Sequence, residues 1–223
     1  MAALSYVKRM LATPTGMKLR KRAPRFVRQG YRLAAQVTEA AHPSPDLPPE
    51  LFEGAVFMPS REAIVASLPK GGRVLEIGTD RGTFAEFILR TAQPDRLHVV
   101  DLDYSRFRDD LKADPRVERH EGFSAEVVAR FEDASFDWIY VDGGHDYPDV
   151  VADAALAARK VKPGGHVIFN DFAHIDPNLG RYGVHRAVSE FLLERRWRIH
   201  AISFHRNGLY DLSVRAEPVG TEG

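Results

Sequence analysis

Short apolar runs alternate with amphipathic segments along most of the chain. Buried strands of a parallel sheet are nearly continuous apolar runs, whereas surface helices repeat apolar residues every three or four positions. On this basis the pattern predicts strands at 73–77, 97–101, 117–121, 136–141 and 166–170, and helices at 83–91, 104–111, 124–131, 148–160 and 183–195. Such alternation indicates an α/β fold with a doubly wound, mostly parallel, Rossmann-like sheet.

Capping and turn signals lie at the two ends of this alternation. Ser60 is a good N-cap for a helix over 61–68, because its hydroxyl can accept a bond from a free backbone N–H of the first turn. Apolar runs at 197–204 and 208–214 are joined by Arg206-Asn207-Gly208. Asn-Gly between two apolar runs predicts an antiparallel C-terminal hairpin.

The segment before Pro59 is basic and rich in proline. Leu4, Val7 and Leu11 have helical spacing, which predicts a helical N-terminal arm. Up to His42 the chain has one acid, Glu39, against a set of cations: Lys8, Arg9, Lys18, Arg20, Lys21, Arg22, Arg25, Arg28 and Arg32. Pro43, Pro45, Pro48 and Pro49 then predict an extended linker. We therefore divide the chain into a basic arm with linker (1–58), a globular domain (59–215) and a flexible tail (216–223).

The arm allows three kinds of contact. Solvation or packing against a protein partner is favoured, contact with an anionic membrane surface or glycolipid phosphate comes next, and nucleic acid is least favoured. Over the whole chain 31 Lys and Arg balance 31 Asp and Glu, so we expect no nucleic-acid partner. The sequence leaves open whether the chain forms a homo-oligomer.

The bulk composition is ordinary for a soluble enzyme, with 44% hydrophobic and 28% charged residues in 223. There is no cysteine, which excludes disulfides and thiolate chemistry and is consistent with a reducing compartment. No apolar run reaches the roughly 18 residues of a membrane span, and no signal peptide is evident. We expect a cytoplasmic protein.

The most informative motif is the segment Arg73-Val-Leu-Glu-Ile-Gly-Thr-Asp-Arg-Gly-Thr-Phe84, a strand, a glycine turn and a helix start. Because Glu76 precedes the turn at Gly78, we expect its carboxylate to be exposed to a ligand crevice. Asp101 ends the next predicted strand, where α/β nucleotide sites place the acceptor for ribose hydroxyls.

The spacing of the glycines favours one kind of nucleoside. Gly78 and Gly82 lie four apart with Asp80 between them, so the turn is not the G-x-G-x-x-G of dinucleotide sites. A carboxylate at Asp80 repels a pyrophosphate but suits a cationic ligand such as S-adenosylmethionine. We therefore favour a methyl donor over NAD.

Oxygen ligands follow two later strands. Asp142 comes after the fourth predicted strand, and Asn170 with Asp171 after the fifth. Ligands bind outside the carboxyl ends of strands in open α/β sheets, so these side chains can converge. Carboxylate and amide oxygens suit Mg²⁺ or a similar hard cation, and three of them leave positions open for substrate.

The second half of the domain carries a family resemblance. Asp142-Gly-Gly-His145-x-Tyr147, Asp153, Lys162-Pro-Gly-Gly165 and Asn170-Asp171 resemble the metal-dependent, macrocin-type O-methyltransferases that modify sugar hydroxyls. The sequence is similar also to catechol O-methyltransferase. The resemblance covers about residues 59–214. It implies a class I methyltransferase fold with S-adenosylmethionine at the first strand ends and a divalent cation, expected to be Mg²⁺, that chelates two substrate oxygens.

The resemblance also implies roles for individual residues. His145 falls where sugar-modifying relatives place a histidine, and it is the expected general base beside Asp142. The expected metal ligands are Asp142, Asn170 and Asp171. The expected donor-binding residues line the first strand ends and the loops around them: Glu76, Gly78, Thr79, Asp80, Gly82, Thr83, Phe84, Asp101, Leu102, Phe123, Ser124 and Asp142.

Two positions depart from the family pattern. Asp80 replaces the usual middle glycine of the donor loop, and Asn170 replaces the first acid of the Asp-Asp pair common among sugar enzymes. The catechol type pairs an Asp with an Asn in the other order, so the total ligand charge is comparable.

These observations predict a metal-assisted, S-adenosylmethionine-dependent O-methyltransferase that acts on a hydroxyl of a saccharide or glycosylated product. Two alternatives stay open at this point. One is a protein that binds S-adenosylmethionine without catalysis and uses its basic arm for assembly. The other, less favoured because the chain lacks a Tyr-x-x-x-Lys pair, is an NAD-dependent oxidoreductase.

Overall fold

The computed structural model describes residues 43–176, 180–204 and 210–217. The chain divides into two compact units, one formed by Ser44–His174 with Gly183–Gly223 and the other by Met1–Pro43 with Ile175–Tyr182. In the second unit, β7 (Ile175–Asp176) pairs with β8 (Gly180–Arg181) in antiparallel fashion. The expected basic helix and the Asn207-Gly208 turn lie outside the described residues.

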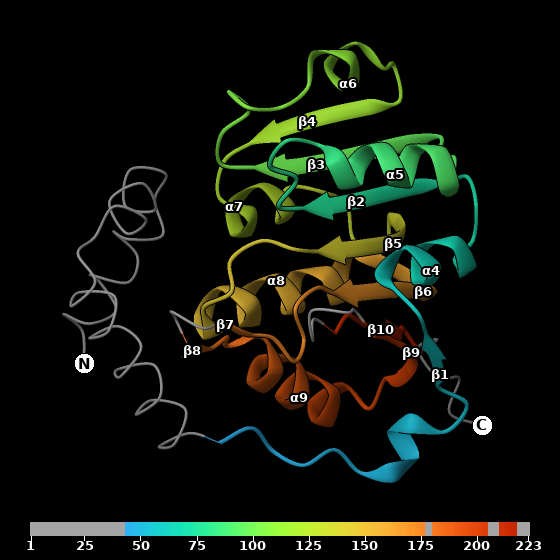
Figure 1. The fold of residues 1–223 in the computed structure, drawn as a ribbon, viewed down its shortest axis with the longest axis vertical. Helices are drawn as coiled ribbons and strands as arrows, with labels where there is room; N and C mark the ends of the chain where they lie inside the picture. Colours follow the sequence, from blue (N-terminus) through green and yellow to red (C-terminus); the bar gives the residue numbers. More distant parts are fainter. Residues whose placement is uncertain (1–42, 177–179, 205–209, 218–223) are drawn as a thin grey trace, which may run out of the picture. The chain divides into compact units, whose positions relative to one another are not determined.

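The larger unit is built on an eight-stranded sheet with the order β1-β9-β10-β6-β5-β2-β3-β4 (Figure 1). Every adjacent pair is parallel except those of β10, which runs antiparallel to β6 and to β9. The predicted mixed sheet with an antiparallel C-terminal pair is therefore confirmed. The strands are β1 (Val56–Met58), β2 (Arg73–Ile77), β3 (Arg96–Asp101), β4 (Val117–Glu121), β5 (Phe136–Val141), β6 (Val161–Phe169), β9 (Arg198–Ser203) and β10 (Leu212–Arg215).

Helices connect the strands and cover both faces of the sheet (Figure 1). They are the short 3₁₀ helix η1 (Pro49–Phe52) and α4 (Arg61–Ser67), α5 (Thr83–Thr91), α6 (Asp109–Ala113), α7 (Ser124–Val128), α8 (Tyr147–Lys160) and α9 (Val184–Arg195). The N-cap prediction is confirmed, because the Ser60 hydroxyl accepts a bond from the backbone N–H of Ala63 at 3.3 Å.

Two predicted boundaries were wrong for local reasons. Helix α6 begins at Asp109 and not at residue 104. The Asp103 carboxylate accepts bonds from the backbone N–H and hydroxyl of Ser105, both at 2.8 Å, and this turn competes with a helix. Strand β6 begins at Val161 and not at residue 166, and its pairing with β5 is irregular in this first part.

The sheet also includes a strand that the apolar pattern did not predict. Val56–Met58 pairs in parallel with Ala201–Ser203 at the edge of the sheet. Its three residues are exposed or only half-buried, so they lack the buried alternation by which strands are recognised. These residues lie within the range that we assigned to the linker.

The core is formed by the apolar sides of the sheet and its helices. Helices α4 and α5 pack on one face through Ile64, Val65, Ile88 and their neighbours, and the other face carries α7, α8 and α9. Trp138 is fully buried and Trp197 is 8% exposed, as expected for core residues. Among the helices of the described residues, none has the length and apolar character required to cross a membrane.

Val65→Ala tests the packing of α4 on the sheet. Val65 is fully buried, so loss of its methyl groups should lower the free energy of unfolding by about 2 kcal/mol. The matched control is Val151→Ala on α8, where the side chain is 40% exposed and the change should stay within about 0.5 kcal/mol. Urea denaturation of both variants measures the difference, and equal midpoints would contradict this packing.

Candidate active site

The carboxyl ends of β2, β3, β5 and β6 lie at one edge of the sheet (Figure 1). The chain leaves β2 toward β3 on one side, and β5 lies on its other side. This reversal of strand order is the point at which open α/β sheets form their ligand crevice. The predicted site residues lie at the ends of these strands and of β4, in the loops after them, or at the starts of the next helices.

The turn after β2 requires glycine at two positions. Gly78 has φ +86°, and a Cβ on it would lie 2.0 Å from the carbonyl oxygen of Asp142. Gly82 has φ +81° and precedes α5, with its N–H bonded to the carbonyl of Thr79 at 2.8 Å. Asp80, between them, also has a positive φ of 46°. The backbone of this turn is therefore packed directly against the loop after β5.

Glu76 contradicts one expectation. Its side chain is only 1% exposed, so the carboxyl group lies under the turn and not in an open crevice. The hydroxyl of Thr79 donates to Glu76 Oε2 at 2.7 Å. Burial raises the pKa of Glu76 to about 8, although the Thr79 bond opposes this shift. Thr79 is therefore a direct partner of Glu76.

The side chain of Asp101 holds the turn after β2 by accepting a bond from the backbone of that turn. Asp101 Oδ2 accepts from the N–H of Asp80 at 2.7 Å, and Oδ1 accepts from the N–H of Leu102 at 2.7 Å. The carboxylate of Asp80 points elsewhere and pairs with Arg106 at 3.2 Å. That Asp101 binds the ribose hydroxyls of the donor stays a prediction. In the structure its carboxylate joins the loop after β2 to the loop after β3.

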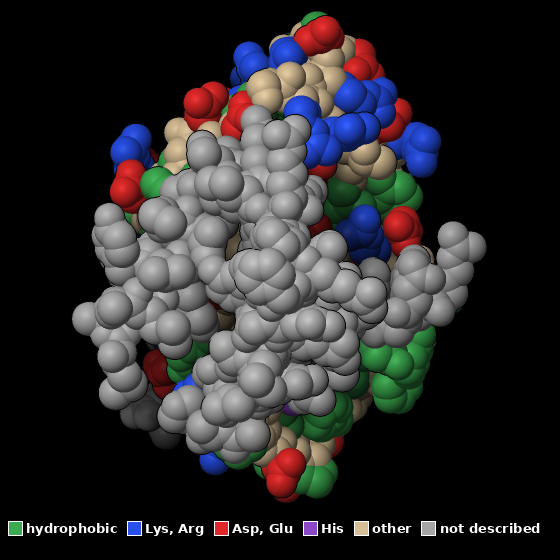
Figure 2. Space-filling model, turned by 60° about the vertical axis from the view of Figure 1, so that its left-hand side comes forward, with side chains coloured by type: hydrophobic (Ala, Val, Ile, Leu, Met, Phe, Trp, Pro, Cys, Tyr) green, Lys and Arg blue, Asp and Glu red, His purple; other side chains and the backbone are tan. Residues whose placement is uncertain are grey.

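Beside this turn lies an open depression of about 450 Å³, lined by Arg81, Thr83, Arg106 and Arg108. Arg106 pairs with Asp80, and Arg108 pairs with Glu86 and Asp110. Figure 2 shows cationic and acidic side chains mixed in this way around the end of the molecule that carries α6. These charges link the α6 segment to the turn after β2.

The remaining predicted donor residues occupy different environments. Phe84 is 8% exposed and packs on the ring of Tyr140 with centroids 4.4 Å apart, so it belongs to the core. Phe123 follows β4 and is 51% exposed, which leaves its ring accessible for stacking, and Ser124 begins α7.

Three groups meet at the ends of β5 and β6. His145 Nε2 lies 3.7 Å from Asp142 Oδ1 and 3.4 Å from Asp171 Oδ2. Asp171 has φ +56°, an uncommon backbone conformation for a residue with a side chain. The structure thus brings Asp142 and His145 together with Asp171, which lies 29 positions after Asp142 in the sequence.

The charges of these groups shift one another. Burial raises the pKa of Asp142 above its usual value, and His145 and Arg61 only partly offset this. Burial alone lowers the pKa of His145, but the hydrogen bond and charge of Asp142 and the charge of Asp171 raise it above the usual value. The imidazole is therefore poised to take up a proton.

Arg61 is a site residue that sequence reasoning missed. Its guanidinium donates to the hydroxyl of Tyr140 at 3.4 Å, lies 3.7 Å from Asp142 Oδ2, and stacks 4.4 Å from the centroid of Phe84. Arg61 follows the N-cap Ser60, and the capping pattern predicts the start of the helix but no role for the arginine. No signal in the sequence places the first turn of α4 beside the end of β5.

Asn170 also has partners that the sequence did not reveal. Its Nδ2 donates to the hydroxyl of Tyr140 at 3.1 Å and to Asp211 Oδ1 at 3.2 Å. Tyr140 in turn donates to Asp211 Oδ2 at 2.6 Å. Burial raises the pKa of Asp211 to about 6, with the Tyr140 bond opposing the shift. In the sequence Tyr140 has the pattern of a core residue of a strand, and Asp211 follows a hairpin turn that lies outside the described residues.

The side chains at these strand ends are of the chemical types that bind a hard divalent cation. Asp142 and Asp171 supply carboxylates that approach the same nitrogen, and Asn170 next to Asp171 supplies an amide. Oxygen ligands of these types are those that Mg²⁺ and Mn²⁺ take in proteins. The metal-binding roles of the three residues stay a prediction.

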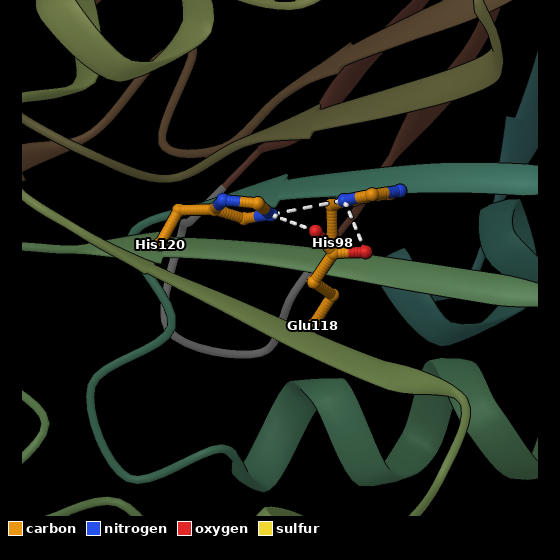
Figure 3. Close-up of side chains that lie close together, drawn as sticks. All are labelled: His98, Glu118 and His120. Carbon is orange, nitrogen blue, oxygen red and sulfur yellow. Dashed lines mark hydrogen bonds and ion pairs between the residues drawn. The ribbon is translucent and has the colours of Figure 1, made fainter.

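A second cluster has the spacing of a metal site. His98 on β3 and Glu118 and His120 on β4 offer ligand atoms within 4.8 Å of one another, and Figure 3 shows their side chains converging. His98 Nδ1 lies 2.9 Å from His120 Nε2, and Glu118 lies 3.6 Å from each ring.

The neighbour on the far side of His98 explains this cluster without an ion. Arg73 Nε donates to His98 Nε2 at 2.9 Å, so the ring proton of neutral His98 is on Nδ1 and is donated to His120. A metal at Nδ1 would displace that proton and lie close to the Arg73 charge. Histidine ligands of metals usually donate from their second nitrogen, which is the opposite arrangement.

This cluster predicts a loss of stability in acid. Burial lowers the pKa of His98 to about 4, Glu118 opposes the shift, and Arg73 and His120 add to it. Between about pH 6.5 and pH 4 the unfolded chain binds the proton that folded His98 refuses, so the free energy of unfolding falls as the pH falls. The loss attributable to His98 is about 3 kcal/mol at most.

Urea denaturation at pH 7 and pH 4.5 measures this loss. His98→Gln, which cannot titrate, should reduce the difference between the two pH values. The control is His174→Gln, outside the cluster, which should leave it unchanged. A His98→Gln variant with the same pH dependence as the wild type would show that the acid sensitivity arises elsewhere.

Comparison with known proteins identifies similar sequences and similar folds. Residues 75–172, from β2 to the turn after β6, match the sequence family described as a methyltransferase domain. No curated protein is similar enough in sequence to count as a match.

Solved structures show the same fold. The pyocyanin biosynthetic protein PhzM superposes with a TM-score of 0.54 at 15% identity, over 70% of this chain and 53% of its own. An O-methyltransferase family protein from Burkholderia thailandensis gives 0.53 at 16%, over 71% and 56%. A SAM-dependent methyltransferase from Aquifex aeolicus gives 0.55 at 14%, over 75% and 91%.

The chain spans little more than half the length of the first two of these proteins. Its residues 75–172 match the methyltransferase domain family, and its fold is the Rossmann-like methyltransferase fold.

Proposed function

We propose that this protein transfers a methyl group from S-adenosylmethionine to a hydroxyl oxygen of a saccharide or glycosylated product, with the help of a divalent cation. The observation that carries the proposal is the approach of Asp142 and Asp171 to one nitrogen of His145, at 3.7 and 3.4 Å. Two carboxylates and an imidazole at the crevice of a methyltransferase fold are the groups needed to bind and deprotonate an alcohol.

His145 is the proton acceptor in this mechanism. An alcohol is a poor nucleophile at neutral pH, and a base in hydrogen-bond reach removes its proton as the new bond to carbon forms. Asp142 and Asp171 stabilise the imidazolium that results, in keeping with the raised pKa of His145. The proton then leaves to solvent when the methylated product departs.

Asp142, Asn170 and Asp171 hold the cation. When bound, the cation lowers the cost of negative charge on the substrate oxygen. The same charge would offset the repulsion between the half-buried carboxylates of Asp142 and Asp171. The turn from Gly78 to Gly82 and the carboxylate of Asp101 bind the donor, and Phe123 offers its exposed ring to the adenine.

The saccharide class rests on the family resemblance of the segment from Asp142 to Asp171. The cytoplasmic location and the contact of the basic arm with a membrane or glycolipid are further expectations, and the arm lies outside the described residues. A protein that binds the donor without catalysis is the competing function. It would bind S-adenosylhomocysteine but show no cation-dependent turnover.

Asp142→Ala tests the cation site. Removal of this carboxylate should abolish Mg²⁺ binding in calorimetric titrations run with saturating S-adenosylhomocysteine. Affinity for S-adenosylhomocysteine itself should stay within about tenfold, because Gly78 and Asp101 remain. The control is Asp109→Ala, an acid of α6 whose side chain is 94% exposed. Unchanged Mg²⁺ affinity in Asp142→Ala would remove this residue from the ligand set.

His145→Ala tests the proton acceptor. Formation of S-adenosylhomocysteine, measured with a panel of saccharides and polyols, should slow by about 10²–10⁴-fold. In the wild type the rate should fall as acid protonates His145, and the variant should lose this part of the pH profile. His174→Ala is the control. A variant with the wild-type rate would exclude His145 as the base.

A further inference from the structure

Behind Asn170 lies a closed network of buried polar side chains. Tyr140 is fully buried, Asp211 is 3% exposed and Asn170 is 7% exposed. Their side chains form a ring of three bonds, from Asn170 to Tyr140 at 3.1 Å, from Asn170 to Asp211 at 3.2 Å and from Tyr140 to Asp211 at 2.6 Å. The residues come from β5, from the segment after β6 and from the segment before β10.

This network has consequences for the orientation of the Asn170 amide. Both acceptors, the Tyr140 oxygen and Asp211 Oδ1, are reached by the same nitrogen, Nδ2. An amide has its nitrogen and oxygen on opposite sides, so Oδ1 of Asn170 faces away from Asp211. A flipped amide would place its oxygen against the Asp211 carboxylate with no proton between them, which is unfavourable.

The backbone fixes the same residue from the other direction. The N–H of Asn170 is bonded to the carbonyl of Val141 at 2.9 Å, which joins it to the residue before Asp142. The backbone of Asp211 is also fixed, because its N–H donates to the hydroxyl of Ser203 at 3.3 Å. Both ends of the Asn170–Asp211 contact are thus anchored to the sheet.

We propose that Tyr140 and Asp211 are positioning residues that hold the Asn170 amide with its oxygen available to the cation. This inference rests on the proposed function, because it assigns a task to residues beside the cation ligands. It also accounts for an amide where sugar-modifying relatives have an acid. A neutral side chain can donate to Asp211 on one side and ligate on the other, whereas a carboxylate at position 170 would face Asp211 with like charge.

The test is a cation titration of the full chain with two single variants, an exchange variant and a control. Asp211→Asn lets the amide at position 170 turn over, and Tyr140→Phe removes one acceptor while it keeps the ring. Residues that orient metal ligands typically change metal affinity by about 10–100-fold when they are replaced. We expect calorimetry with Mg²⁺, in saturating S-adenosylhomocysteine, to show a loss of that order in Asp211→Asn and a smaller loss in Tyr140→Phe.

An exchange variant separates orientation from folding. In Asn170→Asp combined with Asp211→Asn, the donor and acceptor trade places, so the contact re-forms and Mg²⁺ affinity should recover to the wild-type value or above it. The control is Ser189→Ala, a fully buried polar residue of α9 outside the network, which should leave Mg²⁺ affinity unchanged. Affinity for S-adenosylhomocysteine should stay the same in every variant, and this binding also reports that each variant is folded.

The outcomes distinguish this inference from the proposed function. Wild-type protein that binds S-adenosylhomocysteine but no Mg²⁺ or Mn²⁺ would overturn both the cation and the positioning role. Wild-type protein that binds Mg²⁺, with Asp142→Ala deficient and Asp211→Asn within twofold of the wild type, would overturn the positioning role alone. Failure of the exchange variant to recover affinity when it binds S-adenosylhomocysteine normally would do the same.

Discussion

Buried carboxyl groups at one edge of the sheet are the constraint on which the site depends. Glu76, Asp142 and Asp211 are carboxyl groups whose pKa values are raised by burial. Carboxylates leave water at a high cost unless cations or hydrogen-bond donors replace it. Among the described residues, Asp142 has two basic partners, Arg61 and His145. A crevice with this balance favours positively charged ligands, and both the proposed donor and the proposed cation are positively charged.

The fold concentrates that charge by bringing distant segments together. Glu76 and Tyr140 are register partners on neighbouring strands, so their side chains share the face on which α4 places Arg61. The antiparallel strand β10 starts where β6 ends, and this direction delivers Asp211 to Asn170. A parallel strand at this place would carry its first residue to the opposite edge of the sheet. The C-terminal hairpin is therefore part of the site as well as of the sheet.

Much of the fold could be predicted from the sequence, because the buried strands β2, β3 and β5 are apolar runs bounded by turn residues. The edge strand β1 was missed since its residues are exposed, and α6 was misplaced since Asp103 forms a local turn with Ser105. The strand ends predicted that Asp142 and Asp171 lie at one place, and the family resemblance predicted His145 beside them.

Contacts made by side chains across strands could not be predicted in the same way. Tyr140 has the pattern of a core residue, and its hydroxyl gains a function only through Asn170 and Asp211. Glu76 was expected in the open, but Thr79 covers it by a hydrogen bond across the turn. Hydrophobic periodicity shows which face of a strand is buried. It does not show which polar atoms find one another there.

The contact between Gly78 and the Asp142 carbonyl has a mechanical consequence. Backbone rests on backbone at this point, with no side chain between them to yield. The half of the crevice that would hold the nucleoside and the half that would hold the acceptor thus share one rigid wall. A side chain at position 78 would therefore force the two loops apart and change both halves at once.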